Sequence, residues 1–172
     1  MQVLLIRHAI AEDREIYHQL GRPDESRPLT EKGKKDFKKV SKTIRQLWPE
    51  LSLIASSPLK RTSETALILK KEFKKSKLIY LPELEPDSEL SDLQSWLRMM
   101  GRVSMLALVG HEPDLSRILS YFVAGQKQTI FKFKKGGFAL IEFDNLIDKG
   151  TARLICSLQP SHLKKIRSAK TK

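Results

Sequence analysis

The chain has 172 residues, of which 40% are hydrophobic and 30% charged, and this composition excludes an intrinsically disordered protein. We expect one domain over residues 1–160 and a basic, flexible tail over residues 161–172. No apolar run approaches the roughly 20 residues of a membrane span. Residues 1–8 are too few for a removable signal, so we expect a cytoplasmic protein without a membrane partner.

Net charge is the unusual bulk property. The chain has 32 Lys and Arg residues against 20 Asp and Glu residues, which gives +12 and a pI near 9.9. This charge attracts anionic partners, but it does not choose among phosphorylated substrates, acidic proteins, nucleic acid and anionic lipid. The single Cys156 cannot form an internal disulfide, and its apolar neighbours predict a small buried side chain in a reducing compartment.

Four aliphatic residues at positions 3–6 run directly into Arg7 and His8. A run without alternation predicts a strand buried on both faces, as in the parallel sheet of an α/β fold. Because ligands of such sheets lie beyond the carboxyl ends of the strands, Arg7 and His8 are expected at the edge where a site forms. Taken alone, such a pair is more often the start of a solvated loop.

The next elements repeat this arrangement. Residues 12–29 are polar and predict a loop with at most one short helix. Thr30 precedes apolar residues at three- and four-residue steps, which predicts a helix that Thr30 caps and Pro49 ends. Residues 51–55 predict a second buried strand, and the helix after it carries Arg61 in its first turn, where the amino terminus also attracts anions.

Two more strands are predicted in the middle of the chain. The third covers residues 78–81 and leads into an acidic loop that contains Glu83. A helix follows over residues 92–99, with Trp96 turned inward. The fourth strand, residues 105–109, is apolar throughout and delivers His111 to its carboxyl end.

The last part of the chain differs in pattern. After a helix over residues 115–122, residues 131–143 and 151–158 predict two antiparallel strands joined by a turn. Phe131 and Phe133 interleave with lysines, as on a surface that stacks nucleic-acid bases. Period-two alternation explains this pattern better, with the rings inward and the lysines outward.

Three predicted strand ends thus bring Arg7 with His8, Arg61, and His111 to one edge of the sheet. A phosphoryl group spreads its charge over three oxygens, and bidentate guanidinium groups match that geometry better than ammonium groups. A histidine with a free ring nitrogen can accept a phosphoryl group near neutral pH. One histidine can attack while the other donates.

Several motifs resemble the histidine phosphatase superfamily. These are Arg7-His8 after the first strand, Ser57-Pro58-x-x-Arg61 after the second and Gly110-His111 after a later one. Ala9 stands where the phosphoglycerate mutase branch has glycine. Three further motifs resemble the SixA-type phosphohistidine phosphatase subgroup. They are Arg7-His8-Ala9-x-Ala11, Arg27-Pro28-Leu29-Thr30-x-x-Gly33 and Pro82-Glu83-Leu84-x-Pro86. The resemblance covers about residues 1–158 and implies a three-layer α/β/α sandwich around a mainly parallel sheet with one antiparallel strand.

The resemblance also implies a role for each site residue. His8 would be the nucleophile that becomes phosphorylated, and Arg7, Arg61 and His111 would bind the phosphoryl oxygens. Mutase-like relatives place the general acid on a glutamate in an inserted lid, and this chain shows no such lid. Glu83 is therefore the candidate acid, and a loop carboxylate paired with a nearby cation is the alternative reading of that residue.

We therefore expect a metal-independent phosphatase, without a cofactor, that acts on phosphohistidine-containing proteins in phosphorelay signalling. A metal at His111, Glu112 and Asp114 is not expected, because no second ligand cluster is present and nearby arginines would repel a cation. We expect a monomer and no specific nucleic-acid partner. The alternatives are a phosphatase of small phosphoesters and a basic module that binds a phospho-ligand or nucleic acid.

Overall fold

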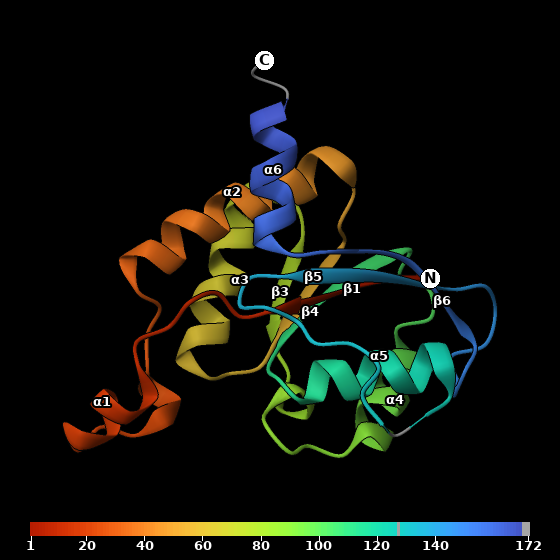
Figure 1. Ribbon diagram of the computed structural model, residues 1–172. Helices are drawn as coiled ribbons and strands as arrows, with labels where there is room; N and C mark the ends of the chain where they lie inside the picture. Colours follow the sequence, from red (N-terminus) through yellow and green to blue (C-terminus); the bar gives the residue numbers. More distant parts are fainter. Residues whose placement is uncertain (127, 170–172) are drawn as a thin grey trace.

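The computed structural model describes residues 1–126 and 128–169, and a six-stranded sheet forms the middle layer of this part (Figure 1). The strand order is β3-β2-β4-β1-β5-β6. Strand β5 is antiparallel to both of its neighbours, and the other pairs are parallel. The strands are β1 (Gln2–Arg7), β2 (Leu53–Ser56), β3 (Lys77–Tyr80), β4 (Met105–Gly110), β5 (Phe138–Phe143) and β6 (Ala152–Leu158).

Helices cover both faces of this sheet, so the predicted three-layer α/β/α sandwich is confirmed. One face carries α2 (Glu31–Leu47), α3 (Lys60–Glu72) and α6 (Pro160–Ala169). The other face carries α4 (Leu90–Met99) and α5 (Asp114–Ala124). The connections contain α1 (Arg14–Gln19) and two short 3₁₀ helices, η1 (Asp24–Ser26) and η2 (Pro82–Leu84). None of the described helices has an apolar stretch long enough to cross a bilayer.

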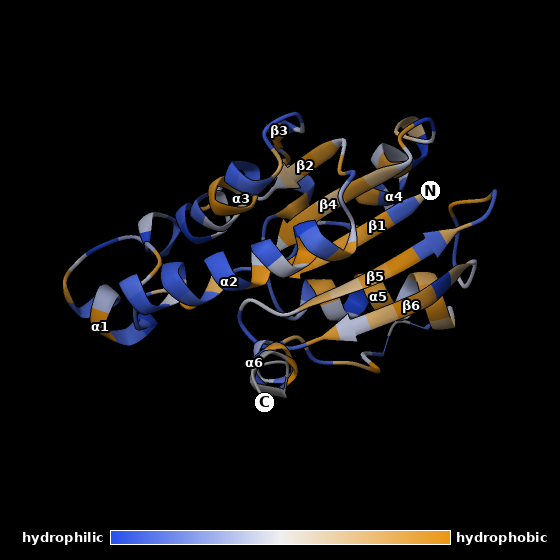
Figure 2. Cartoon of the chain, turned by 90° about the horizontal axis from the view of Figure 1, so that it is seen from above, coloured by the Kyte–Doolittle hydropathy of each residue, from blue (hydrophilic) through white to orange (hydrophobic). Residues whose placement is uncertain are grey.

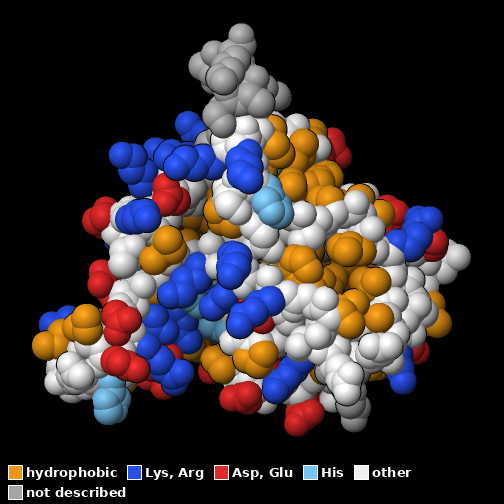
Figure 3. All heavy atoms as spheres, viewed as in Figure 1, with side chains coloured by type: hydrophobic (Ala, Val, Ile, Leu, Met, Phe, Trp, Pro, Cys, Tyr) orange, Lys and Arg blue, Asp and Glu red, His pale blue; other side chains and the backbone are white. Residues whose placement is uncertain are grey.

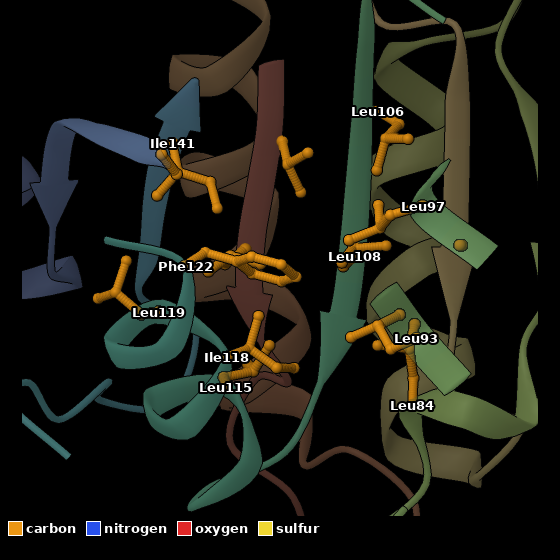
Figure 4. Packing of buried hydrophobic residues seen from close by; sticks show 14 of the residues in the cluster. Leu84, Leu93, Leu97, Leu106, Leu108, Leu115, Ile118, Leu119, Phe122 and Ile141 are labelled. Carbon is orange, nitrogen blue, oxygen red and sulfur yellow. The ribbon is translucent and has the colours of Figure 1, made fainter. Parts of the chain in front are cut away.

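The central strands are buried on both faces, as their aliphatic runs predict. Figure 2 shows β1 and β4 as largely hydrophobic strands between more hydrophilic helices. Alternate residues of β1 belong to two separate core clusters, one under each helical layer. In the layer of α4 and α5, Leu97 and Phe122 pack toward Leu108 of β4 (Figure 4). Burial of both faces leaves the carboxyl ends of the strands as the place for polar side chains.

Several local predictions are confirmed. Thr30 caps α2, because its Oγ1 accepts a hydrogen bond of 2.9 Å from the N–H of Gly33. The helix ends at Leu47, two residues before Pro49. The short helix expected in the polar segment 12–29 is α1.

The first predicted strand of the tail region is too long at its start. Residues 131–137 are not a strand, and β5 begins at Phe138 after a turn in which Gly136 has φ of 76°. Instead of pairing in the sheet, the N–H of Phe133 donates to the Glu112 carboxylate, at 2.9 Å. Phe133 is nevertheless fully buried, so the inward direction of its ring agrees with the alternation.

The segment predicted as a flexible tail from residue 161 is helical over the part that the structure describes. Residues 160–169 form α6, which begins with a proline in its first turn and places Leu163 against α2, where only 6% of it is exposed. One apolar anchor in a lysine-rich segment was too weak a pattern to indicate this helix. Residues 170–172 lie outside the described residues. Cys156 is half-buried rather than buried, because it lies on the edge strand β6.

Candidate active site

His8 follows β1 and is held by the backbone on two sides. Its N–H donates to the carbonyl of Gly110 at the end of β4 (3.1 Å), and its carbonyl accepts from the N–H of Gly136 (2.9 Å). The next residue is tied to α3, because the N–H of Ala9 donates to Oγ1 of Thr65 at 3.1 Å. These contacts with β4, with the segment before β5 and with α3 fix the position of His8, which is 5% exposed.

The ring of His8 is in a nucleophilic form. Its Nδ1 lies 2.7 Å from the carbonyl oxygen of Ala9, and a carbonyl can only accept, so Nδ1 carries the hydrogen. The lone pair is therefore on Nε2. The pKa of His8 is lowered to about 2, mainly by burial and to a smaller extent by His111, Arg61 and Arg7, while the bond to Ala9 opposes the shift. The imidazole is thus neutral at physiological pH.

Arg61 comes from the first turn of α3, directly after β2. It is 4% exposed, and its Nη1 donates to the backbone oxygen of Asp24 (3.0 Å) and lies 3.1 Å from Oδ2 of the same residue. Its Nε is buried and has no partner. Burial lowers the pKa of Arg61, and the charge of Asp24 opposes this shift.

Arg7 is anchored in the same way from the opposite side. Its Nη1 donates to the carbonyl of Phe133 at 2.6 Å, in the irregular segment before β5. Its Nε is also buried and has no partner. Burial lowers the pKa of Arg7, and the nearby charge of Glu112 raises it. Arg61, which is buried, and Arg7, which is half-buried, thus each use one Nη atom to contact the protein and leave Nε without a partner.

His111 follows β4, which pairs with both β1 and β2. It is 3% exposed, and its ring centroid lies 5.4 Å from that of His8. Its Nε2 shares a hydrogen bond of 2.9 Å with Oγ of Ser57, while its Nδ1 is buried without a partner. Burial lowers the pKa of His111 to about 3, with a further contribution from Arg61.

These four side chains line one pocket of about 430 Å³ at the carboxyl ends of β1, β2 and β4. Figure 3 shows basic side chains gathered around a histidine on this face, between α1 and α5. Three nitrogen atoms of residues that line the pocket are buried and have no partner, namely Nε of Arg7, Nε of Arg61 and Nδ1 of His111. Unsatisfied buried nitrogens are costly and rare, so three of them on residues that line one pocket mark it as a candidate binding site.

Glu83 lies apart from this pocket. It is half-buried in η2, and it lines a separate cavity of about 50 Å³ between η2, α4 and α5. His111 lines both cavities. Oε2 of Glu83 is buried without a partner, and within residues 1–126 and 128–169 Glu83 forms no ion pair. The structure therefore places Glu83 beside His111 rather than in the pocket of His8.

The motif His111-Glu112-x-Asp114 does not form a metal cluster. Across the described chain, no group of three His, Cys, Asp or Glu side chains could hold a metal ion. Glu112 is instead occupied by Oγ of Ser116 and the N–H of Phe133, at 2.8 and 2.9 Å.

Three groups that hold side chains of the pocket were not found from the sequence: Asp24, the Ser57 hydroxyl and the Phe133 carbonyl. Ser57 stands within a motif that was noted for Arg61, so a signal existed. Asp24 lies in a polar segment, and a backbone carbonyl leaves no mark in the sequence, so neither could be identified before the tertiary contacts were known.

Comparisons with known proteins place the chain among related sequences. Residues 3–91 match the family model of the histidine phosphatase superfamily, branch 1. An uncharacterized protein of Picosynechococcus sp. is 33% identical over 139 residues, which cover 80% of this chain and 82% of that protein.

The fold is shared with several solved structures. The protein histidine phosphatase SixA in complex with tungstate superposes with a TM-score of 0.77 and 21% identity, over 95% of this chain and 99% of that chain. A candidate phosphohistidine phosphatase SixA of Agrobacterium tumefaciens gives 0.75 and 23%, over 92% and 97%. The α-ribazole phosphatase of Shigella flexneri gives 0.71 and 14%, over 93% and 97%. At these identities the likeness shows the fold.

Proposed function

The chain belongs to the histidine phosphatase superfamily, and from that premise we propose that it is a protein phosphohistidine phosphatase with His8 as its nucleophile. Phosphatase chemistry is supported by the family. The finer proposal is that the substrate is phosphohistidine in a protein, and that the reaction uses no metal. The two SixA-type structures are among those that share the fold, and their substrate class is carried to this chain as part of the proposal.

One observation carries the proposal. Nε2 of His8 has its lone pair available, and three buried nitrogens without partners belong to the residues around it, Arg7, Arg61 and His111. A guanidinium matches the oxygens of a phosphoryl group through two parallel hydrogen bonds. The pocket thus combines a nucleophile with donors for the oxygens of the group that it attacks.

In the first step, Nε2 of His8 attacks phosphorus and the P–N bond to the substrate imidazole breaks. The Nε atoms of Arg7 and Arg61 stabilise the charge on the equatorial oxygens during this transfer. The leaving imidazole takes the electron pair of the broken bond and departs neutral, because its other ring nitrogen already carries a hydrogen.

In the second step, water attacks the phosphoryl group on His8. The P–Nε2 bond breaks, its electron pair returns to Nε2, and the water proton passes to the departing phosphate. The bond from Nδ1 to Ala9 keeps the same tautomer throughout, so His8 leaves each cycle ready for the next. The low pKa of His8 favours this return, since the free imidazole stays unprotonated.

The leaving group favours phosphohistidine over an alkyl phosphate. An alkoxide needs a proton donor in the transition state, a contribution worth about 10²- to 10⁴-fold. The carboxyl group of Glu83 lines the neighbouring cavity rather than the pocket of His8. A site with this arrangement is suited to a leaving group that departs without a strong acid, and its volume of about 430 Å³ is sufficient for a histidine side chain.

A second candidate function is hydrolysis of small phosphoesters. Glu83 supports it, because its Oε2 is buried without a partner in a cavity that His111 also lines. An α-ribazole phosphatase also shares the fold. The two candidates differ in the leaving group, so substrates with imidazole and alkoxide leaving groups separate them.

The decisive experiment uses a protein labelled with ³²P on histidine, incubated with the enzyme and quenched in alkali, because phosphohistidine is labile in acid. We expect release of phosphate by the wild type and a loss of at least about 10³-fold in His8→Ala, since the nucleophile is absent. A chelator is expected to leave the rate unchanged. A folded His8→Ala protein with wild-type turnover would contradict the mechanism.

A further inference from the structure

Arg61 belongs to a chain of contacts among residues that line the pocket. Asp24 accepts from Arg61 through its backbone oxygen and Oδ2, and it accepts from Nε of Arg27 through Oδ1 at 2.9 Å. Arg27 is itself buried, with 7% exposed, and its Nη1 donates to the carbonyl of Glu12 at 2.8 Å. Among the described residues, Asp24 is therefore the only one whose carboxylate pairs with the guanidinium of Arg61.

The contacts are asymmetric on the guanidinium of Arg61. Its Nη1 is used twice by Asp24, whereas its Nε is buried and unpartnered. A guanidinium presents five donors in a planar fork, and its two-donor edge of Nε and Nη2 can bind a phosphoryl group side-on. Which edge faces the pocket depends on what holds Nη1. That role is performed by Asp24.

The charges around Arg61 make this contact necessary. Arg27 and Arg14 lower the pKa of Arg61 by repulsion, in addition to the larger effect of burial, and Asp24 is the group that opposes them. Burial would raise the pKa of Asp24, but hydrogen bonding to Arg27 and the charge of Arg61 hold it below its usual value, so the carboxylate is ionised. Without it, Arg61 would face two like charges with one end of its fork free.

The anchor of Arg7 differs in kind. Its Nη1 is held by the Phe133 carbonyl, which is neutral and part of the backbone. Asp24 is instead a charged side chain on the segment 12–29, which joins α3 independently through a hydrogen bond of 2.8 Å from the N–H of Leu29 to Glu64. Removal of the Asp24 charge should therefore leave the segment in place and affect the direction of Arg61.

We propose that Asp24 is a positioning residue for the phosphoryl-transfer reaction: it holds Nη1 of Arg61 and thereby turns the Nε and Nη2 edge toward the phosphoryl group. The proposal rests on the proposed function and deepens it. It also implies that Asp24 has opposite effects on binding and on catalysis. The negative charge of Asp24 opposes anion binding in the ground state, while the alignment that it provides acts in the transition state, where geometry has its largest effect on rate.

The test is Asp24→Asn, which keeps the size of the side chain and removes its charge. We expect kcat toward a phosphohistidine protein to fall about 10- to 100-fold, because small misplacements of a binding group carry such costs. We expect the Kd for tungstate, a phosphate analogue, to stay equal or fall, because a repulsive charge has been removed. The matched control is Asp144→Asn, since Asp144 also pairs with an arginine, Arg153 at 2.8 Å, but is not among the residues that line the pocket.

A double-mutant cycle with Arg61→Lys isolates the contact. With a lysine at position 61 there is no fork to align, so adding Asp24→Asn should cost less than threefold in kcat. Additive losses, a kcat of Asp24→Asn within twofold of wild type, or a parallel loss of tungstate binding would each overturn the proposal. Should Asp24→Asn not fold, Asp24→Glu, which keeps the charge and displaces it by one methylene, is expected to show the same loss in kcat.

The tungstate titrations also separate this proposal from the proposed function. If the wild type does not hydrolyse phosphohistidine, the proposed function fails, while binding still reports on Arg61. In that case Arg61→Lys should weaken tungstate binding at least about tenfold, whereas Asp24→Asn should leave the Kd for tungstate equal or lower. Weaker tungstate binding by Asp24→Asn would refute the role of Asp24 in positioning.

Discussion

Two regions of this molecule are positively charged, and they differ in almost every physical respect. In the pocket, Arg7 and Arg61 are largely buried, and each is held by one oxygen-bearing partner at Nη1 with Nε left free. In the outer helical layer, α2 carries seven Lys or Arg residues and two acidic ones, and most of these side chains face solvent. Figure 2 shows this helix as mainly hydrophilic. Net charge is thus a property of the outer helices, whereas the proposed chemistry depends on a few fixed guanidinium groups.

The difference between these two regions is tested most directly by replacing a buried arginine with lysine. Arg61→Lys keeps the charge and removes the fork, and we expect kcat/KM for phosphohistidine to fall about 10²- to 10³-fold, the usual cost of one preorganised donor. Steady-state kinetics with a purified, folded variant measure this. The same change at Arg45 of α2, which is exposed, is the control and should have no effect. A loss under threefold at position 61 would mean that charge alone is sufficient.

The acidic segment of residues 82–92 contrasts with the basic composition of the rest of the chain. Residues 82–92 hold five acidic and no basic residues, and among them Glu83 has a buried oxygen without a partner. We expect Glu83→Gln to slow hydrolysis of alkyl phosphates by about 10- to 100-fold and hydrolysis of phosphohistidine by less than threefold, because only the alkoxide needs an acid. Parallel rate measurements on the two substrates test this. Equal damage to both would favour the small-phosphoester function.

The same two regions show what could be predicted from the sequence. The strand ends at Arg7, His8 and His111 were predicted because aliphatic runs identify buried strands and parallel strands end at one edge. The anchors of the arginines were not, since Asp24 and the Phe133 carbonyl reach them only through tertiary contacts. The helix α6 was missed for a related reason. Its single buried anchor, Leu163, has meaning only when α2 is beside it.

Buried and exposed histidines should differ in how they affect the pH dependence of stability. Burial lowers the pKa of His8 to about 2 and of His111 to about 3, against about 6.5 in the unfolded chain. Below pH 6.5 the unfolded chain therefore binds protons that the folded state does not, so stability falls as pH falls, by up to about 1.4 kcal/mol per pH unit for each histidine. Above pH 6.5 this contribution is constant.

Urea denaturation at pH 7.5 and 5.5 measures the effect. We expect the midpoint of the wild type to drop between the two values, and the drop to shrink in His111→Asn, which cannot titrate. His18→Asn is the control, because His18 is exposed on α1, and it should leave the drop unchanged. An equal drop in wild type and His111→Asn would mean that His111 is protonated in the folded protein.

The smallest effect is expected on the lysine-rich surface itself. Lys38 and Lys42 are exposed on one side of α2, and the double charge reversal Lys38→Glu and Lys42→Glu lowers the net charge from +12 to +8. Fields of exposed charges are screened beyond about 8 Å at physiological ionic strength, so the pocket should not sense this change. We expect kcat/KM for free phosphohistidine to stay within twofold of wild type.

With an acidic phosphoprotein the association rate should fall severalfold at low salt, because long-range attraction speeds encounter, and the difference should vanish at high salt. A loss with free phosphohistidine that persists at high salt would show that the two populations of positive charge are coupled, and that α2 takes part in catalysis rather than in encounter alone.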